Sequence, residues 1–105
     1  MPRNRDTTPR ISGIPMIRRP STSATNPPSW FLNIPELNRK ISVEGYRTST
    51  GRISHRWTIE ILGTHRFIER EGTTTNGQQK AANAAIRWLV SQSEKVFKFA
   101  GRKPR

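Results

Sequence analysis

The sequence has no cysteine, few acidic residues and no long hydrophobic run. The lack of cysteine excludes disulfides and thiolate metal sites but leaves the cellular compartment open. No apolar stretch approaches the roughly 20 residues that a membrane-spanning helix needs. The first residues also lack the continuous apolar segment of a secretory signal. Because only 31% of the 105 residues are hydrophobic, the chain can build one modest core and one small domain.

Positive charge is what the sequence has in excess. It contains 19 lysines and arginines against 7 acidic residues, for a net charge of +12. Residues 1–26 carry a net +4 and residues 95–105 a net +5, while the long middle part, 27–94, carries only +3. This excess indicates a polyanionic partner, usually a nucleic acid and less often an anionic membrane. A soluble surface with cationic tails is the simpler alternative.

Residues 1–26 have scattered prolines and no apolar periodicity, so we predict a disordered basic arm. Their Arg-rich, Ser/Thr-rich composition is typical of organelle transit peptides, but the prolines would break the amphipathic helix of a mitochondrial presequence. We therefore expect an intracellular protein, in the nucleus or cytoplasm, with an organelle left open. Residues 93–105 are expected to form a basic C-terminal tail.

Between these tails, residues 27–92 are predicted to fold. Hydrophobic residues recur there at spacings of three and four, which favours a short first helix: Trp30, Phe31, Leu32, Ile34, Leu37 and Ile41. Residues 41–49, 54–63 and 66–75 are predicted to be strands, and the second of them alternates strictly between apolar and polar positions.

A second helix is expected to begin at Thr75 or Asn76 and to run to about Gln92. Its packing face is small and apolar, with Ala81, Ala84, Ala85, Trp88 and Leu89 three and four residues apart. The predicted fold class is therefore α+β, in the order α-β-β-β-α. Two helices would pack on one face of a three-stranded antiparallel sheet, with disordered basic tails on both sides.

Four features carry a resemblance to a known family. Tyr46 lies in the first predicted strand and Gly51 precedes the second. Trp57 begins a stretch in which apolar and polar residues alternate. The fourth feature is the Ala-rich segment NAAIRWLV at 83–90. With the order of the elements, these features make residues 27–92 resemble a double-stranded RNA-binding domain. Such domains bind A-form RNA across two minor grooves and the major-groove phosphates between them.

The resemblance implies three groups of RNA contacts. The lysine-rich start of the family's second helix corresponds here to Gln78, Gln79 and Lys80, of which only the last is a cation. These side chains and the helix N-terminal amides are expected to contact phosphates. In the loop between the first two strands, Arg52 and His55 are expected to reach a minor groove.

The first helix of the family supplies the third group of contacts, which corresponds here to Glu36, Asn38 and Arg39. Neither a paired-carboxylate site in a pocket nor a set of metal ligands stands out in the sequence. We therefore expect no enzymatic activity, no cofactor, no metal, no small-molecule substrate and no membrane association.

The resulting hypothesis is sequence-independent binding of double-stranded RNA by a small accessory factor. Its setting would be RNA silencing or its suppression, RNA processing, or a ribonucleoprotein. Two alternatives stay open. One is a docking module that binds a second copy of itself or another domain of this family, with RNA affinity coming from the tails. The other is a structural protein of an organellar ribosome.

Overall fold

The computed structural model describes residues 7–20, 27–63 and 67–99, and the fold is α+β. In chain order the elements are β1 (Arg10–Ile11), β2 (Ile14–Pro15), β3 (Ile17–Arg19), β4 (Ser29–Ile34), the 3-10 helix η1 (Pro35–Leu37), β5 (Arg39–Arg47), β6 (Ile53–Ile61), β7 (Ile68–Thr74) and α1 (Gln78–Phe99). No helix in this described part is long and apolar enough to cross a membrane.

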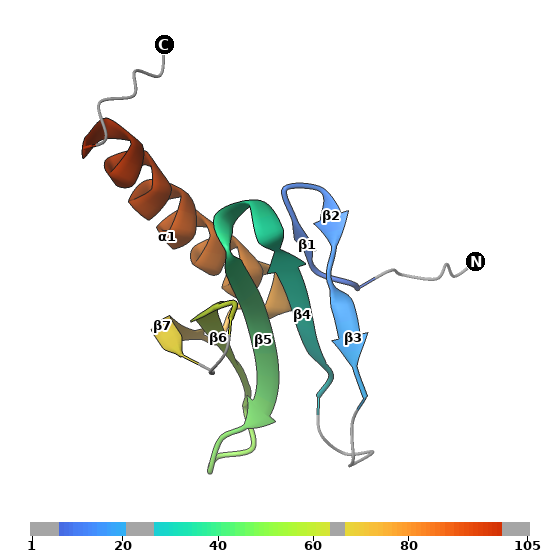
Figure 1. The fold of residues 1–105 in the computed structure, drawn as a ribbon. Coiled ribbons are helices and arrows are strands. Elements are labelled where there is room, and N and C mark those ends of the chain that lie inside the picture. The colour runs from blue at the N-terminus through green and yellow to red at the C-terminus, as the bar shows by residue number, and fades with distance from the viewer. Residues whose placement is uncertain (1–6, 21–26, 64–66, 100–105) are drawn as a thin grey trace.

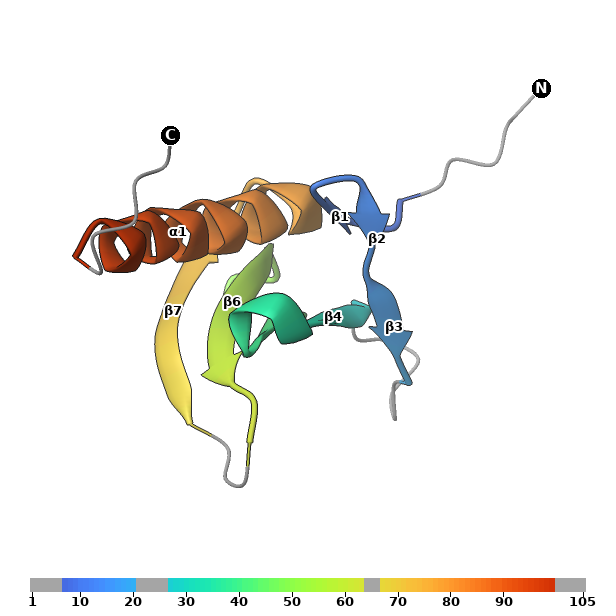
Figure 2. The same cartoon turned by 45° about the horizontal axis from the view of Figure 1, so that its top comes forward.

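Five of the strands form a single antiparallel sheet in the order β3-β4-β5-β6-β7 (Figure 1). Each strand therefore pairs with the strands that precede and follow it in the sequence. Strands β1 and β2 form a separate two-stranded hairpin. Helix α1 packs against β5, β6 and β7 on one face of the sheet, and the β1–β2 hairpin lies beside the start of the helix (Figure 2).

Alternate residues of the central strands point toward α1 and form the core. The cross-strand pairs Ile41–Ile59 and Val43–Trp57 are buried between the sheet and the helix. The helix meets them with the buried small residues Ala81, Ala82 and Ala85. Because an alanine side chain ends at Cβ, these positions let the helix backbone lie close to the sheet.

The predicted first helix is wrong, because residues 29–34 form strand β4. Within this strand the inward-facing Trp30, Leu32 and Ile34 are two residues apart and belong to or pack against the core. All six residues of β4 pair with β5. The hydrophobic residues whose spacing suggested a helix belong to three successive elements, β4, η1 and β5. Their spacing of three and four therefore does not describe any one element. The molecule therefore has one long helix on a five-stranded sheet, and not two helices on a three-stranded sheet.

The folded part of the chain also begins earlier than residue 27. Strand β3 pairs with β4, and the preceding hairpin buries Ile11 and Met16 in the core. The turn of this hairpin holds Ser12 at φ 51° and Gly13 at φ 83°. Two left-handed residues in succession suit the tight turn of a β-hairpin, whose twist matches that of its strands. Residues 10–19, expected to belong to a disordered arm, thus extend the sheet and complete the core. Residues 1–6 and 21–26 of that arm lie outside the described residues.

From β5 onward the order of the elements, three strands followed by a helix, agrees with the order predicted from the sequence. Strand β6 forms where it was predicted, with Trp57 and Ile59 buried against the helix, but burial does not alternate along it, because Thr58 and Glu60 are buried as well. Helix α1 begins close to its predicted start and ends seven residues beyond the predicted end, at Phe99. The expected C-terminal tail therefore contributes its first residues to the helix, while residues 100–105 lie outside the described part.

One position of β7 has no room for a side chain. A Cβ atom on Gly72 would lie 2.6–2.8 Å from three atoms of the Trp57 indole, which belongs to the neighbouring strand. We therefore expect Gly72→Ala to destabilise the protein by about 1–3 kcal/mol, through overpacking against a rigid ring. Urea denaturation monitored by circular dichroism would measure this loss.

Thr73→Ala is the matched control, since it alters an exposed neighbour in the same strand. Its effect should stay within about 0.5 kcal/mol. Equal stability of the Gly72→Ala variant and the wild type would contradict the close packing of Trp57 against this strand.

Candidate nucleic-acid interface

The turn between β5 and β6 presents two arginines at one end of the sheet. It is closed by hydrogen bonds from the Thr48 amide to the Arg52 carbonyl (2.8 Å) and from the Gly51 amide to the Thr48 carbonyl (2.9 Å). Gly51 has φ 86°, a left-handed conformation that glycine adopts without strain. Arg47 and Arg52 lie on either side of this turn, and both are exposed. Arg52 was expected from the sequence to contact RNA. Arg47, which precedes the same turn, was not.

Strand β7 ends near this turn, and α1 begins four residues later. His55, near the start of β6, pairs with Thr74, the last residue of β7, so the segment leading into the helix begins beside the β5–β6 turn. The chain reverses at Gly77, which has φ 103°, and Lys80 is exposed in the first turn of the helix. The partial positive charge of a helix N-terminus adds to that of this lysine.

We call the surface formed by residues 45–55 and 72–80 the hairpin end. These two segments contain no aspartate or glutamate, while Arg47, Arg52 and Lys80 are exposed on them. They also carry threonines, serines and an asparagine, which can donate hydrogen bonds to phosphate oxygens. The hairpin end is therefore a positively charged, hydrogen-bonding surface without a competing carboxylate in its own segments.

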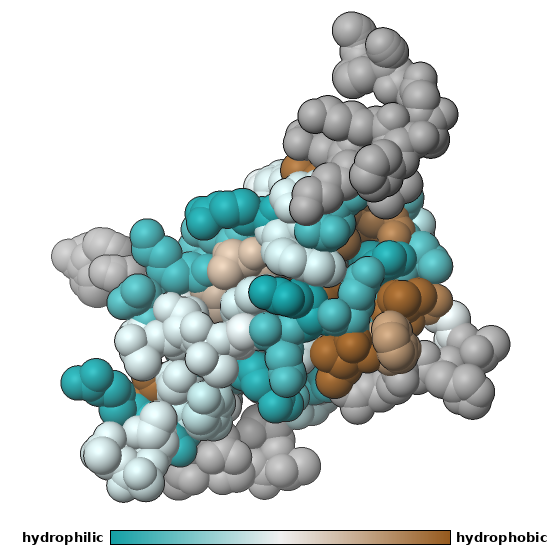
Figure 3. Space-filling model, turned by 90° about the vertical axis from the view of Figure 1, so that its left-hand side faces the viewer, coloured by the Kyte–Doolittle hydropathy of each residue, from teal (hydrophilic) through white to brown (hydrophobic). Residues whose placement is uncertain are grey.

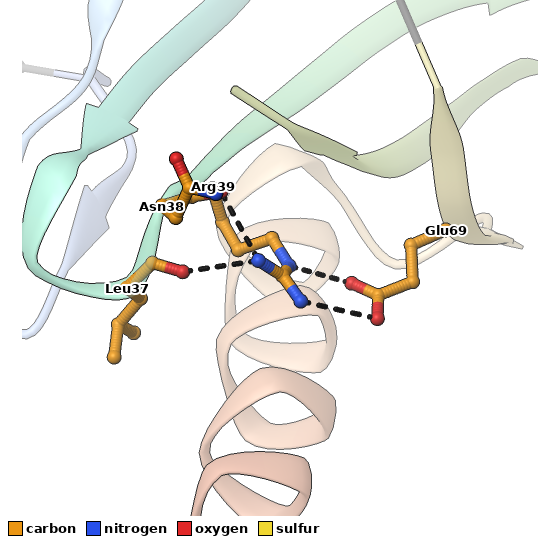
Figure 4. Close-up of polar contacts among 4 residues, drawn as sticks. All are labelled: Leu37, Asn38, Arg39 and Glu69. Carbon is orange, nitrogen blue, oxygen red and sulfur yellow. Dashed lines mark hydrogen bonds and ion pairs between the residues drawn. The ribbon is translucent and has the colours of Figure 1, made fainter. Parts of the chain in front are cut away.

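Two acidic residues of the sheet, Glu44 and Glu71, directly adjoin the segments of the hairpin end, and both are near Arg56. The Arg56 guanidinium lies 3.4 Å from the Glu44 carboxylate and 3.8 Å from that of Glu71. Arg39 bonds the Glu69 carboxylate with two nitrogens, at 2.7 and 3.3 Å, and donates to the backbone carbonyls of residues 37 and 38 (Figure 4). These carboxylates thus neutralise two arginines.

The residues that correspond to the family's first helix lie far from the hairpin end. Asn38, which has φ 57°, ends η1, and Glu36 is exposed within it. Arg39 begins β5 and Arg47 ends it, so about 26 Å of extended strand separates them. The structure therefore places the three residues of this group at the opposite end of the sheet, on a short 3-10 helix and the start of a strand in place of an α-helix.

The two glutamines expected to contact phosphates form hydrogen bonds within the chain. The Gln78 side chain accepts a hydrogen bond from the Trp30 indole N–H (2.8 Å) and donates one to the Thr7 carbonyl. The Gln79 side chain accepts from the Arg10 amide and donates to the Arg10 carbonyl, both at 2.8 Å. A side-chain amide both donates and accepts, so it can hold an extended backbone as a neighbouring strand does. The amides therefore fix residues 7–10 against the start of α1.

His55 points into the protein. Only 7% of its surface is exposed, and its Nδ1 atom has no hydrogen-bond partner among the described residues. Gly45, opposite it on β5, makes room for the imidazole, because a Cβ there would lie 3.2 Å from Nε2. Burial lowers the pKa of His55. The structure therefore leaves Arg52 and Lys80 exposed, one after the β5–β6 turn and the other in the first turn of α1, and buries His55.

Within the described residues no three histidine or acidic side chains come together as metal ligands would. No protein-family model matches the chain, and neither does any curated protein or solved structure. The resemblance to double-stranded RNA-binding domains therefore stays a prediction that depends on the residues themselves.

The buried histidine leads to a pH dependence of stability. Its pKa is lowered from 6.5 in the folded protein, so between that lowered pKa and 6.5 the unfolded chain holds a proton more often than the folded chain does. The free energy of unfolding should therefore fall as the pH is lowered from 7.5 to 5. Urea denaturation at both pH values would measure this change in the wild type and in His55→Gln.

The variant has no ionisable group at this position, so it should lose less stability between the two pH values than the wild type does. This difference does not depend on the variant's own stability at neutral pH. An identical loss in both proteins would show that His55 does not cause the pH dependence.

Proposed function

We propose that this protein is a non-enzymatic RNA-binding factor that binds double-stranded RNA without sequence specificity, through the hairpin end. The observation that carries the proposal is the exposure of Arg47, Arg52 and Lys80 on two segments without a carboxylate, one of which leads into the N-terminus of α1. The net charge of +12 adds a long-range attraction for any polyanion.

The chemistry of this surface suits phosphates better than base edges. Cationic side chains, hydroxyl groups and helix N-terminal amides all bind phosphate oxygens, and such contacts orient a protein on a duplex without reading its sequence. Each cation that neutralises a phosphate releases a counterion, which makes the affinity dependent on salt. The resemblance noted in the sequence is the reason for choosing duplex RNA over duplex DNA.

The binding mode must differ from that of the family. Gln78 and Gln79 hold the N-terminal segment, so Lys80 is the side chain of the helix start that is left to contact phosphate. The arginines of the β5–β6 turn would supply the neighbouring contacts. An intracellular role in RNA silencing or its suppression, RNA processing, or a ribonucleoprotein belongs to this proposal.

The test is a salt titration of the full chain with a blunt duplex of about 20 base pairs, as RNA and as DNA. We expect tighter binding to RNA. Replacing both Arg52 and Lys80 by glutamine should weaken binding about tenfold at 0.15 M salt and should lower the slope of log affinity against log salt by about 2.

Lys80→Arg, which keeps the charge, should bind RNA as the wild type does. Arg18→Gln is the charge control, since it removes one exposed arginine from β3, outside the hairpin end. The proposal fails if the Arg52 and Lys80 replacements change binding no more than Arg18→Gln does. Absence of duplex binding by the wild type would favour the alternative of a protein-docking module.

A further inference from the structure

A groove of about 630 Å³ runs between strand β7 and helix α1, at the edge of the sheet. The side of the molecule that carries β7 and α1 is mostly hydrophilic, with hydrophobic residues gathered toward one edge of the view (Figure 3). Aromatic and cationic side chains line the groove together, chiefly Trp57, Trp88, Arg70 and Arg87. This combination is not explained by the hairpin end described above.

The two aromatic residues of the groove differ in exposure. Trp57 lies on β6 and is buried, with its indole packed against Gly72 of β7. Trp88 lies on α1 and is partly exposed, with the Arg70 guanidinium 5.7 Å from its ring centroid. Indole rings and the guanidinium plane are both surfaces on which a nucleic-acid base can stack.

The cations of the groove favour an anionic ligand. Arg70 and Arg87 are both exposed, one on each wall. The carboxylate in the lining, Glu71, lies 3.8 Å from a nitrogen of Arg56, which partly neutralises it. A ligand that presents a flat ring and a negative charge would match this arrangement better than an apolar peptide would.

The groove is continuous with the hairpin end along the helix. Lys80, Ala84, Arg87 and Ser91 lie four, three and four residues apart, which puts them on one stripe of α1. Lys80 belongs to the hairpin end, whereas the other three line the groove. Seven helical residues advance about 10 Å along the axis, so a strand leaving the hairpin end reaches the groove within a few nucleotides.

We propose that this groove binds unpaired nucleotides of RNA that extend from a duplex held at the hairpin end. A base stacks on the Trp88 indole or on the Arg70 guanidinium that covers it, and Arg87 contacts the phosphate. The inference deepens the proposed function and rests on it for the identity of the ligand as RNA. The preferred substrate is then a duplex with a single-stranded extension.

The experiment compares the binding of two RNA duplexes of about 20 base pairs, one blunt and one with a three-nucleotide 3′ overhang of adenines. The wild-type chain should bind the overhang duplex about tenfold more tightly, which corresponds to one stacked base. Trp88→Leu and Arg70→Gln should each reduce this preference to less than threefold and leave the affinity for the blunt duplex unchanged. Trp88→Phe, which keeps an aromatic face, should retain the preference.

Trp88 is partly buried, so Trp88→Leu is compared only if its thermal unfolding midpoint is close to that of the wild type. Arg70→Gln tests the same groove without removing a core side chain. Arg52→Gln is the matched control, because it should weaken binding of both duplexes by the same factor. The inference is overturned if the wild type shows no preference for the overhang, or if the preference persists in Arg70→Gln.

A five-adenine single-stranded RNA separates the two proposals. If the wild type binds this RNA, and Arg70→Gln binds it at least threefold more weakly, the groove is supported even if the blunt duplex does not bind and the duplex proposal fails. If the blunt duplex binds, while the single strand does not and the overhang adds nothing, the groove proposal fails alone. A hexaglutamate peptide that displaces the single strand at equal concentration would identify the groove as a site for acidic peptides and overturn the inference.

Discussion

The close approach of α1 to the sheet is the constraint on which the other features depend. Ala81, Ala82 and Ala85 carry no atoms beyond Cβ, so the first half of the helix lies against the buried residues of β5 and β6. This closeness brings the Gln78 amide within 2.8 Å of the Trp30 indole N–H. Further along the helix larger residues replace alanine, and Trp88 lines the groove beside β7. The change from alanine to larger residues along α1 therefore accounts for two features, the start of the helix held by the Gln78 hydrogen bonds and the groove beside Trp88.

The distribution of charge separates arginines that are paired with carboxylates from arginines on segments without one. Arg39 and Arg56 are paired with carboxylates of neighbouring strands, so they contribute to the sheet more than to the binding of a polyanion. Arg47 and Arg52 flank a turn whose segment contains no carboxylate. Exposed cations without a nearby carboxylate attract anions, and the net charge of +12 adds to that attraction. This attraction is the physical reason for the proposal that the hairpin end binds RNA.

Local patterns in the sequence were sufficient for some elements and not for others. Strand β6 and helix α1 were recognisable because each repeats its own period over many residues. Strand β4 was mistaken for a helix, because its apolar residues combined with Leu37 and Ile41 of the following elements into a helical spacing. Strands β1 and β2 have two residues each and show no period at all. They form because the core has a place for Ile11 and Met16.

The sequence by itself determined the excess of positive charge, the alanine face of the helix and the cations at positions 52 and 80. These properties depend on residue type and on spacing within one segment. Only the tertiary structure decided that Gln79 is bonded to Arg10, 69 residues away, and that His55 is buried beneath the surface it was expected to form. It also created the groove, whose walls come from β7 and α1. Contacts of this kind depend on which strands and helices become neighbours, and that is set by the packing of the whole core.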